Sequence, residues 1–263
     1  MVRIRVVAIL GVCLLAASAA LAEPTSPTGT VKLAYTGVDP AGAAYIWLDY
    51  NYSNAYYVGK YNTQLDLSYT PTGEGVDIYA AFPSGAMGTF CADMRQDAYS
   101  GWAVYEVYRP ADAPIGGANP EDGMGEAKAS DLRKLFFNYL YGGDDDVWTP
   151  DEAAAFQASV WEIIFEQEST YDVDSASDDK GSFYMSYYWA GSWISMANTW
   201  LSALSGYDDP DIGLRVLAND ELQDYAITVP GLGGEPIPEP LTMLGVFAGV
   251  AGLGGYIRRR RMA

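Results

Sequence analysis

The 263-residue chain contains no histidine, and this absence removes several classes of catalytic site at once. Serine–histidine–aspartate and cysteine–histidine catalysis are excluded, as are zinc sites with imidazole ligands. The chain also lacks a glycine-rich phosphate loop between a strand and a helix, which argues against nucleotide chemistry. Carboxylate pairs remain available, but with 34 acidic residues such pairs are expected by chance and indicate little.

Cysteine is nearly absent, since the sequence has only Cys13 and Cys91. Cys13 lies in a segment typical of a secretory signal peptide: Arg3 and Arg5 precede an apolar run, and Ala20-Leu21-Ala22 forms a small-residue cleavage site. Cleavage after residue 22 leaves Cys91 as the single cysteine of an exported protein. No internal disulfide is then possible, so Cys91 is either buried, paired with another molecule, or chemically special.

The C-terminal end carries a second targeting pattern. Pro238, Glu239 and Pro240 precede an apolar run at the short limit for a membrane-spanning helix (241–257), and the chain then has a cluster of Arg258, Arg259, Arg260 and Arg261. This order of features resembles the PEP-CTERM sorting signal of exported bacterial proteins. The resemblance implies that an exosortase recognises the tripeptide and removes the tail. The protein would then pass from a transient inner-membrane anchor to the cell surface or extracellular matrix.

Basic residues are also scarce. The two terminal segments hold six of the 15 lysines and arginines but only one of the 34 acids, which leaves nine basic and 33 acidic residues and a formal charge of −24 on the mature body. Such a surface repels nucleic acid and anionic membranes and favours solubility. We therefore predict no nucleic-acid partner.

Short β-strands dominate the first part of the mature chain. Stretches rich in aromatic and β-branched residues are separated by Gly, Pro, Asn and Ser clusters, two of which are 37–42 and 51–54. The predicted strands are 31–35, 44–50, 55–58, 76–82, 89–94 and 102–108, followed near the other end by 214–217 and 222–229. Strands at this spacing predict an antiparallel sandwich or barrel.

Three helices are predicted between these two groups of strands, at 130–141, from Thr149 to about Glu168, and at 186–205. Ser130 is expected to cap the first of them. The second has the strongest start signal, because Thr149-Pro150-Asp151-Glu152 supplies a cap, a first-turn proline and a capping-box glutamate. The predicted fold class is therefore α+β, an antiparallel β-sandwich or barrel with a helical insertion at about 126–206.

The second helix has apolar residues at the spacing of a buried face, with Gln157 as the one polar member. The apolar members are Pro150, Ala153, Ala154, Val160, Trp161, Ile164 and Phe165. A buried amide without hydrogen-bond partners costs about 1–3 kcal/mol. Either a hydrogen-bond network satisfies Gln157, or its amide has been consumed chemically.

Two short motifs favour the second possibility. Phe90-Cys91-Ala92-Asp93 on a predicted strand and Phe156 to Ile163 on the helix together resemble the thioester domain of bacterial surface adhesins. That family joins an aromatic-Cys motif and a Gln-x-x-x-Trp motif by an internal thioester. The resemblance implies a covalent bond between Cys91 and Gln157, with Phe90 and Trp161 as supporting residues.

The chemistry of such a bond is consistent with these residue types. A thiolate attacks the side-chain amide carbon of a held glutamine and ammonia leaves, a reaction that proximity makes possible. An amine or hydroxyl on a partner can then take the acyl group, which leaves a covalent link and a free thiol. We therefore expect a binding protein that attaches once, without a cofactor, and not a turnover enzyme.

The predicted organisation is a signal peptide (1–22), a lead-in (23–30), a thioester-type body (31–229), a linker with the sorting motif (230–240), and a membrane helix with a basic tail (241–263). Two readings remain as alternatives. One is a non-reactive, acidic, β-rich matrix protein. The other is a carbohydrate-binding or hydrolysing domain, suggested by Trp47, Trp102, Trp148 and Trp189. Acidic clusters at 144–146 and 172–179 could bind calcium, but the second lacks the glycine and the closing glutamate of an EF-hand loop, so no metal ligand is assigned.

Overall fold

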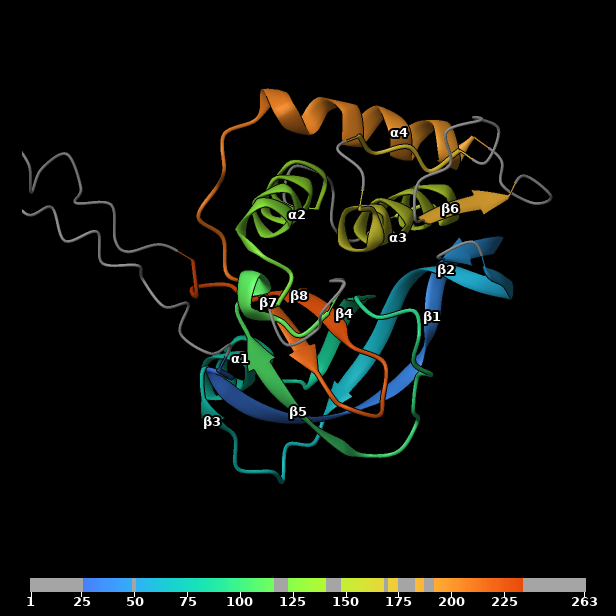
Figure 1. The fold of residues 1–263 in the computed structure, drawn as a ribbon. Helices are drawn as coiled ribbons and strands as arrows, with labels where there is room; N and C mark the ends of the chain where they lie inside the picture. The colour runs from blue at the N-terminus through green and yellow to red at the C-terminus, as the bar shows by residue number, and fades with distance from the viewer. Residues whose placement is uncertain are drawn as a thin grey trace, which may run out of the picture.

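The computed structural model describes residues 26–48, 51–115, 123–140, 148–167, 170–174, 183–186 and 192–233. Within these ranges the chain forms four α-helices and an antiparallel sheet of eight strands, which confirms the α+β class (Figure 1). No helix of the described ranges combines the length and apolar character needed to cross a membrane. The predicted signal peptide, the sorting motif, the C-terminal helix and its arginine cluster lie outside these ranges.

The strands are joined by a path of pairings that returns to its start. The path runs β2-β4-β8-β7-β5-β1-β3, β1 also pairs with β2, and β6 pairs with β1. The bounds are β1 (Gly29–Leu48), β2 (Asn51–Leu65), β3 (Thr72–Gly73), β4 (Ala86–Cys91), β5 (Ala103–Tyr108), β6 (Phe183–Ser186), β7 (Leu214–Ala218) and β8 (Tyr225–Thr228). Seven of the eight predicted strand regions overlap observed strands, with 31–35 and 44–50 both in β1, whereas 76–82 does not; β3 and β6 were not predicted.

The long hairpin β1–β2 is the main departure from the strand predictions. The predicted breaks at 37–42 and 51–54 are wrong, because β1 continues through the first and β2 begins inside the second. The pairing shifts register between Tyr35 and Gly37 and again between Val38 and Ala41. These bulges accommodate glycine and proline inside a paired strand, so residues that usually end a strand here only bend it.

A second departure is α1 (Gly75–Ala81), a helix where the β-branched and aromatic residues predict a strand at 76–82. Only Gly75 and Ile78 of this helix are buried. The Tyr79 hydroxyl lies within hydrogen-bond distance of the carbonyls of Lys32 and Asp66, which fixes the helix against β1 and the turn after β2. Tertiary contacts therefore override a weak local preference for extended backbone.

The remaining helices lie together on one side of the strands (Figure 1). They are α2 (Glu126–Tyr139), α3 (Pro150–Phe165) and α4 (Trp193–Ala203), with short 3₁₀ turns at η1 (Pro110–Asp112) and η3 (Leu204–Gly206). The predicted cap at Ser130 is wrong, because α2 starts at Glu126 after Gly125. The predicted helix start at residue 186 is also wrong, because 183–186 pairs with the outer part of β1 as strand β6.

The start of α3 forms as predicted. The Thr149 hydroxyl accepts from the Glu152 backbone N–H at 3.2 Å, and the Glu152 carboxylate accepts from the Thr149 backbone N–H at 2.8 Å. With Pro150 in the first turn, this is a complete capping box. The boundary of α3 is thus set by local chemistry.

The single buried face predicted for α3 is wrong, because every residue from Ala153 to Phe165 is buried. The helix lies against β1, β2, β4 and β6 and contacts both α2 and α4. Ser159 and Glu162 are buried as well as Gln157, so Gln157 is not the only polar residue in this environment. The central position of α3 brings it to the end of β4.

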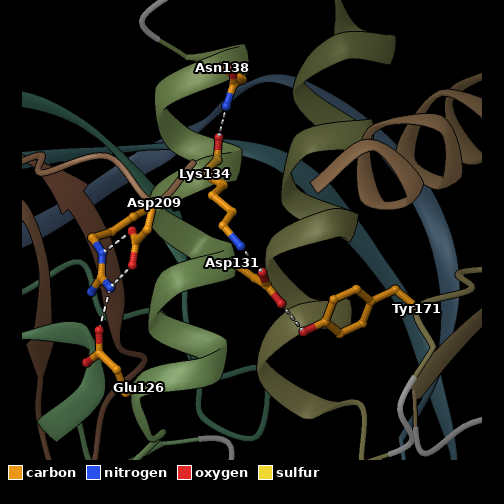
Figure 2. A network of polar contacts seen from close by, with 7 residues as sticks. Glu126, Asp131, Lys134, Asn138, Tyr171 and Asp209 are labelled. Atoms are coloured by element: carbon orange, nitrogen blue, oxygen red, sulfur yellow. Dashed lines mark hydrogen bonds and ion pairs between the residues drawn. The ribbon is translucent and has the colours of Figure 1, made fainter. Parts of the chain in front are cut away.

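Polar contacts at the surface of α2 hold the helical layer together (Figure 2). The Arg133 guanidinium bonds Glu126 on its own helix and Asp209 after η3, with Nε to Asp209 Oδ1 at 2.7 Å. Asp131 accepts from Lys134 at 3.1 Å and from the Tyr171 hydroxyl at 2.9 Å. These contacts tie α2 to the segments that follow α3 and α4.

Candidate functional site

Cys91 is the last residue of β4 and is fully buried. On one side β4 pairs with β2, but that pairing ends at Thr89, opposite Tyr61. On the other side Cys91 lies opposite Tyr225 of β8. Within the part of the chain that the structure describes, the end of β4 is therefore paired with β8 alone.

Among the strands of the described residues, none forms a hydrogen bond with the N–H or the C=O of Cys91. The Ala92 N–H donates to the Asp224 carbonyl at 2.8 Å, so residues 92 and 224 form a hydrogen-bonded pair. Bonded and non-bonded pairs alternate in an antiparallel ladder, so the Cys91–Tyr225 pair is non-bonded. The N–H and C=O of Cys91 therefore point to the other side, beyond the end of the β2 pairing.

Gln157 occupies the place of the missing strand. Its side-chain Oε1 accepts from the Cys91 N–H at 2.8 Å, and its Nε2 donates to the Cys91 carbonyl at 2.9 Å. The side-chain amide thus makes both hydrogen bonds that a paired strand residue would make. Gln157 is 0% exposed, as is Cys91. The structure brings together these two residues, which lie 66 positions apart in the sequence.

The two supporting residues of the predicted site also border it. Phe90 packs against Phe156, with ring centroids 4.5 Å apart, and against Trp148 and Phe136. Trp161, one helical turn after Gln157, is 1% exposed, and its Nε1 has no hydrogen bond of normal geometry within the described residues. Phe90 thus belongs to an aromatic cluster next to Cys91, and Trp161 interacts with the Cys91 thiol.

Sequence reasoning missed a third polar residue of the site. Gln223, two residues before β8, is 5% exposed, and its Nε2 donates to Cys91 Sγ at 2.6 Å. Its Oε1 is buried without a hydrogen-bond partner among the described residues. No local pattern marks Gln223, which lies in a polar turn. Only the register of β4 with β8 would have located it.

The surroundings of the thiol act on its pKa in opposite directions. Burial raises the pKa of the Cys91 thiol well above its ordinary value, and the charges of Asp93 and Asp224 raise it further. Interactions with Trp161 and Gln223 lower it. Burial also raises the pKa of Asp93 and of Asp224. A neutral thiol is therefore the resting form, and polar contacts partly favour the thiolate.

A second acidic site, centred on the buried Glu162, lies further along α3. Glu162 is 0% exposed, and burial raises its pKa well above the ordinary value. Its Oε1 accepts from the Asp172 N–H at 2.6 Å, while Oε2 has no partner among the described residues. Asp172 itself accepts from Asn198 and from the Asp174 N–H. Within the described residues no three acidic or sulfur ligands are placed to hold a metal ion.

The tryptophans and carboxyl groups on which the carbohydrate hypothesis rests lie in different environments. Trp148 packs in the core against Phe90, and Trp47 stacks on Tyr184, while Trp102 is 49% exposed. Trp189 lies outside the described residues. A cavity of about 470 Å³ is lined by two acids and three arginines: Glu74, Asp211, Arg109, Arg133 and Arg215. Hydrogen bonds from Arg215 lower the pKa of Glu74, so this cavity does not present a carboxyl pair of raised pKa.

Comparison with protein-family models, with curated proteins and with solved structures gave no match. The function of the protein must therefore be inferred from the residues of the chain itself.

Proposed function

We propose that this protein is an exported surface protein whose body forms an internal thioester between Cys91 and Gln157 and attaches covalently to a partner nucleophile. The observation that carries this proposal is the pair of hydrogen bonds between the Gln157 amide and the Cys91 backbone. These bonds hold the amide beside the residue that carries the thiol. A reacting pair held in this way gains a large effective concentration over the same groups in solution.

The reaction balances without an external reagent. The Cys91 sulfur bonds to Cδ of Gln157, the C–N bond of the amide breaks, and ammonia leaves with the thiol proton. The product carries no charge, which suits a site where both residues are 0% exposed.

Transfer to a partner is the second half of the proposed function. An amine or hydroxyl of a surface or matrix ligand attacks the thioester carbonyl, and Cys91 leaves as a thiol. The chain attaches once and does not turn over.

The closed path of strand pairings supports a barrel rather than a sandwich as the frame of this domain.

The direct test is the intact mass of the purified mature protein. We expect a mass lower than that of the unmodified chain by one ammonia, and we expect Cys91→Ala and Gln157→Ala to restore the full mass. Treatment with methylamine should add one methylamine to the wild type and none to either variant. An unmodified wild-type mass, together with a thiol that alkylates after unfolding, would identify the non-reactive matrix protein instead.

The sorting part of the proposal rests on Pro238, Glu239 and Pro240 before an apolar run and a basic end. We propose that an exosortase-type enzyme removes this tail after the apolar helix has anchored the chain in the inner membrane. Glu239→Ala should leave the protein in the membrane fraction, and Glu235→Ala, a change of a nearby acid outside the tripeptide, should not. Release of the Glu239→Ala protein at the wild-type level would contradict exosortase handling.

A further inference from the structure

Among the described residues, Gln223 donates a hydrogen bond to the Cys91 sulfur. Its position follows from the antiparallel pairing of β4 with β8. Cys91 lies opposite Tyr225, so residue 223 occupies the diagonal position on the same face of the ladder. The backbone of this segment is fixed in addition by Ala92 N to Asp224 O at 2.8 Å and by Gln223 N to Asp97 O at 3.2 Å.

The two glutamines of the site therefore form hydrogen bonds with different parts of the same cysteine. Gln157 bonds the N–H and C=O of Cys91, whereas Gln223 bonds its sulfur. A buried polar side chain normally has its hydrogen bonds met, yet Oε1 of Gln223 has no partner in the part of the chain described. Beside a thiolate, such an amide can donate a hydrogen bond from its N–H to the sulfur. Beside a neutral thiol, it can rotate so that its oxygen accepts a hydrogen bond from the S–H.

From this geometry we infer that Gln223 is a positioning residue for the thioester, which holds the Cys91 sulfur toward the Gln157 amide and stabilises it as the thiolate. The inference rests on the proposed function. A donor to sulfur acts in both directions of the reaction, because the thiolate is the attacking group during formation and the leaving group during transfer.

The groups that face the sulfur determine how this role depends on pH. Asp93 lies two residues after Cys91 in the chain, and Asp224 is adjacent to Gln223. The charges of both aspartates disfavour the Cys91 thiolate. Trp161 from α3 and Gln223 favour it. Tyr225 lies opposite Cys91 on β8. Burial raises the pKa of Tyr225, so its hydroxyl stays neutral over the pH range of the experiment. Loss of Gln223 therefore removes one of two groups that counter burial and the acids.

The test follows thioester re-formation in the mature protein. Ammonia opens the thioester to the Cys91 thiol and the Gln157 amide, the ammonia is removed, and the intact mass is recorded over time across a pH series. Gln223→Met keeps the length of the side chain and removes both polar atoms. We expect it to slow re-formation by about tenfold or more, the rate equivalent of a lost hydrogen bond to a charged group, and to move the pH profile to higher pH.

Gln96 provides a matched control. Its Nε2 donates to the carbonyls of Asn219 and Asp220 in the same turn that leads to Gln223, and its Oε1 is also without a partner among the described residues, but it does not bond the sulfur. Gln96→Met should leave the rate and the pH profile unchanged. If Gln223→Met does not fold, as judged by circular dichroism, Gln223→Asn replaces it, since a shorter amide loses the sulfur contact.

The outcomes separate the two proposals. A wild-type protein that never loses ammonia contradicts the thioester itself. A wild type that forms the thioester, with a folded Gln223 variant that re-forms it at the same rate and with the same pH profile, overturns only the role of Gln223. An equal slowing by Gln96→Met, without a change of pH profile, would also overturn that role, because it would trace the effect to the turn.

Discussion

Arg215 of β7 forms a two-point ion pair with Glu74, the residue that precedes α1 and lies 141 positions earlier in the sequence. The distances are 2.7 Å from Nε to Oε2 and 2.9 Å from Nη2 to Oε1. Thr28, just before β1, donates to the same carboxylate at 2.6 Å. One partly buried carboxylate thus connects the beginning of the sheet, the first helix and a late strand.

We expect Glu74→Gln to lower the free energy of unfolding near neutral pH by about 2 kcal/mol, the scale of a hydrogen bond to a charged group. The pKa of Glu74 is lowered from 4.5, first by its hydrogen bond with Arg215. A lowered folded pKa contributes stability above the unfolded value, and this contribution is lost as the pH falls. Urea denaturation should therefore show the gap between wild type and variant shrinking below about pH 4.5.

The control for Glu74 is Glu221→Gln, which changes an exposed acid in the turn between β7 and β8. Its effect should stay within about 0.5 kcal/mol at every pH. A gap for Glu74→Gln that stays constant down to about pH 3 would contradict the assigned role of the ion pair.

Gln157 is predicted to stabilise the fold even where no thioester can form. In a Cys91→Ala background, Gln157→Leu leaves the N–H and C=O of residue 91 buried and unpaired. We expect a further loss of about 2–6 kcal/mol, from about 1–3 kcal/mol for each of the two unsatisfied groups. Denaturation of the single and double variants measures this difference directly. Equal stability of the two proteins would mean that the paired hydrogen bonds contribute nothing.

Glu162 is predicted to destabilise the protein at neutral pH. Burial raises its folded pKa above 4.5, so the unfolded chain releases the proton first and stability falls as the pH rises through that value. Glu162→Gln keeps an oxygen for the Asp172 N–H and removes the charge. We expect the variant to unfold at a higher temperature than the wild type at about pH 7.5, and the two melting temperatures to converge at about pH 4.

The corresponding control is again the exposed Glu221→Gln. A Glu162→Gln protein less stable than wild type at neutral pH would indicate that the buried carboxylate has a favourable partner. Lys128 is the candidate, since its charge opposes the shift of the Glu162 pKa.

The capping box of α3 gives a prediction that involves only local structure. Thr149→Ala removes the acceptor for the Glu152 N–H, and we expect a loss of about 1 kcal/mol in the free energy of unfolding. Ser202→Ala, on an exposed position of α4, should change stability by less than about 0.5 kcal/mol. Equal effects of the two changes would argue against a structural role of the cap.

Local signals were sufficient where the responsible groups are close in sequence. The start of α3 was predictable because Thr149 and Glu152 are three residues apart and bond each other. The register shifts of β1 were not predictable, because the bulges that absorb Gly37 depend on pairing with β2. The helix α1 was mistaken for a strand because Tyr79 is fixed by carbonyls from other elements.

The prediction that Gln157 is buried is confirmed, but the helical periodicity on which it rests does not explain the burial. Its spacing placed it on an apolar face, but the whole of α3 from Ala153 to Phe165 is buried, so periodicity did not distinguish it from Ser159 or Glu162. Gln223 gave no signal at all, since a glutamine in a polar turn is ordinary on the surface of a protein. It lies 132 positions from Cys91 in the sequence, and the two meet only through the pairing of β4 with β8.

The amino-acid sequence alone excludes histidine chemistry, leaves Cys91 as the one cysteine beyond residue 13, and predicts the helix that begins at Pro150. These follow from composition and from bonds between near neighbours. The atoms of Cys91 that each glutamine contacts, in contrast, depend on how the helix and the strands pack. The end of the β2 pairing exposes the backbone of Cys91 to Gln157, and the register of β8 aims Gln223 at the sulfur. Hydrogen bonds have a range of about 3 Å, so contacts between distant residues exist only once helix and strands are packed in one register.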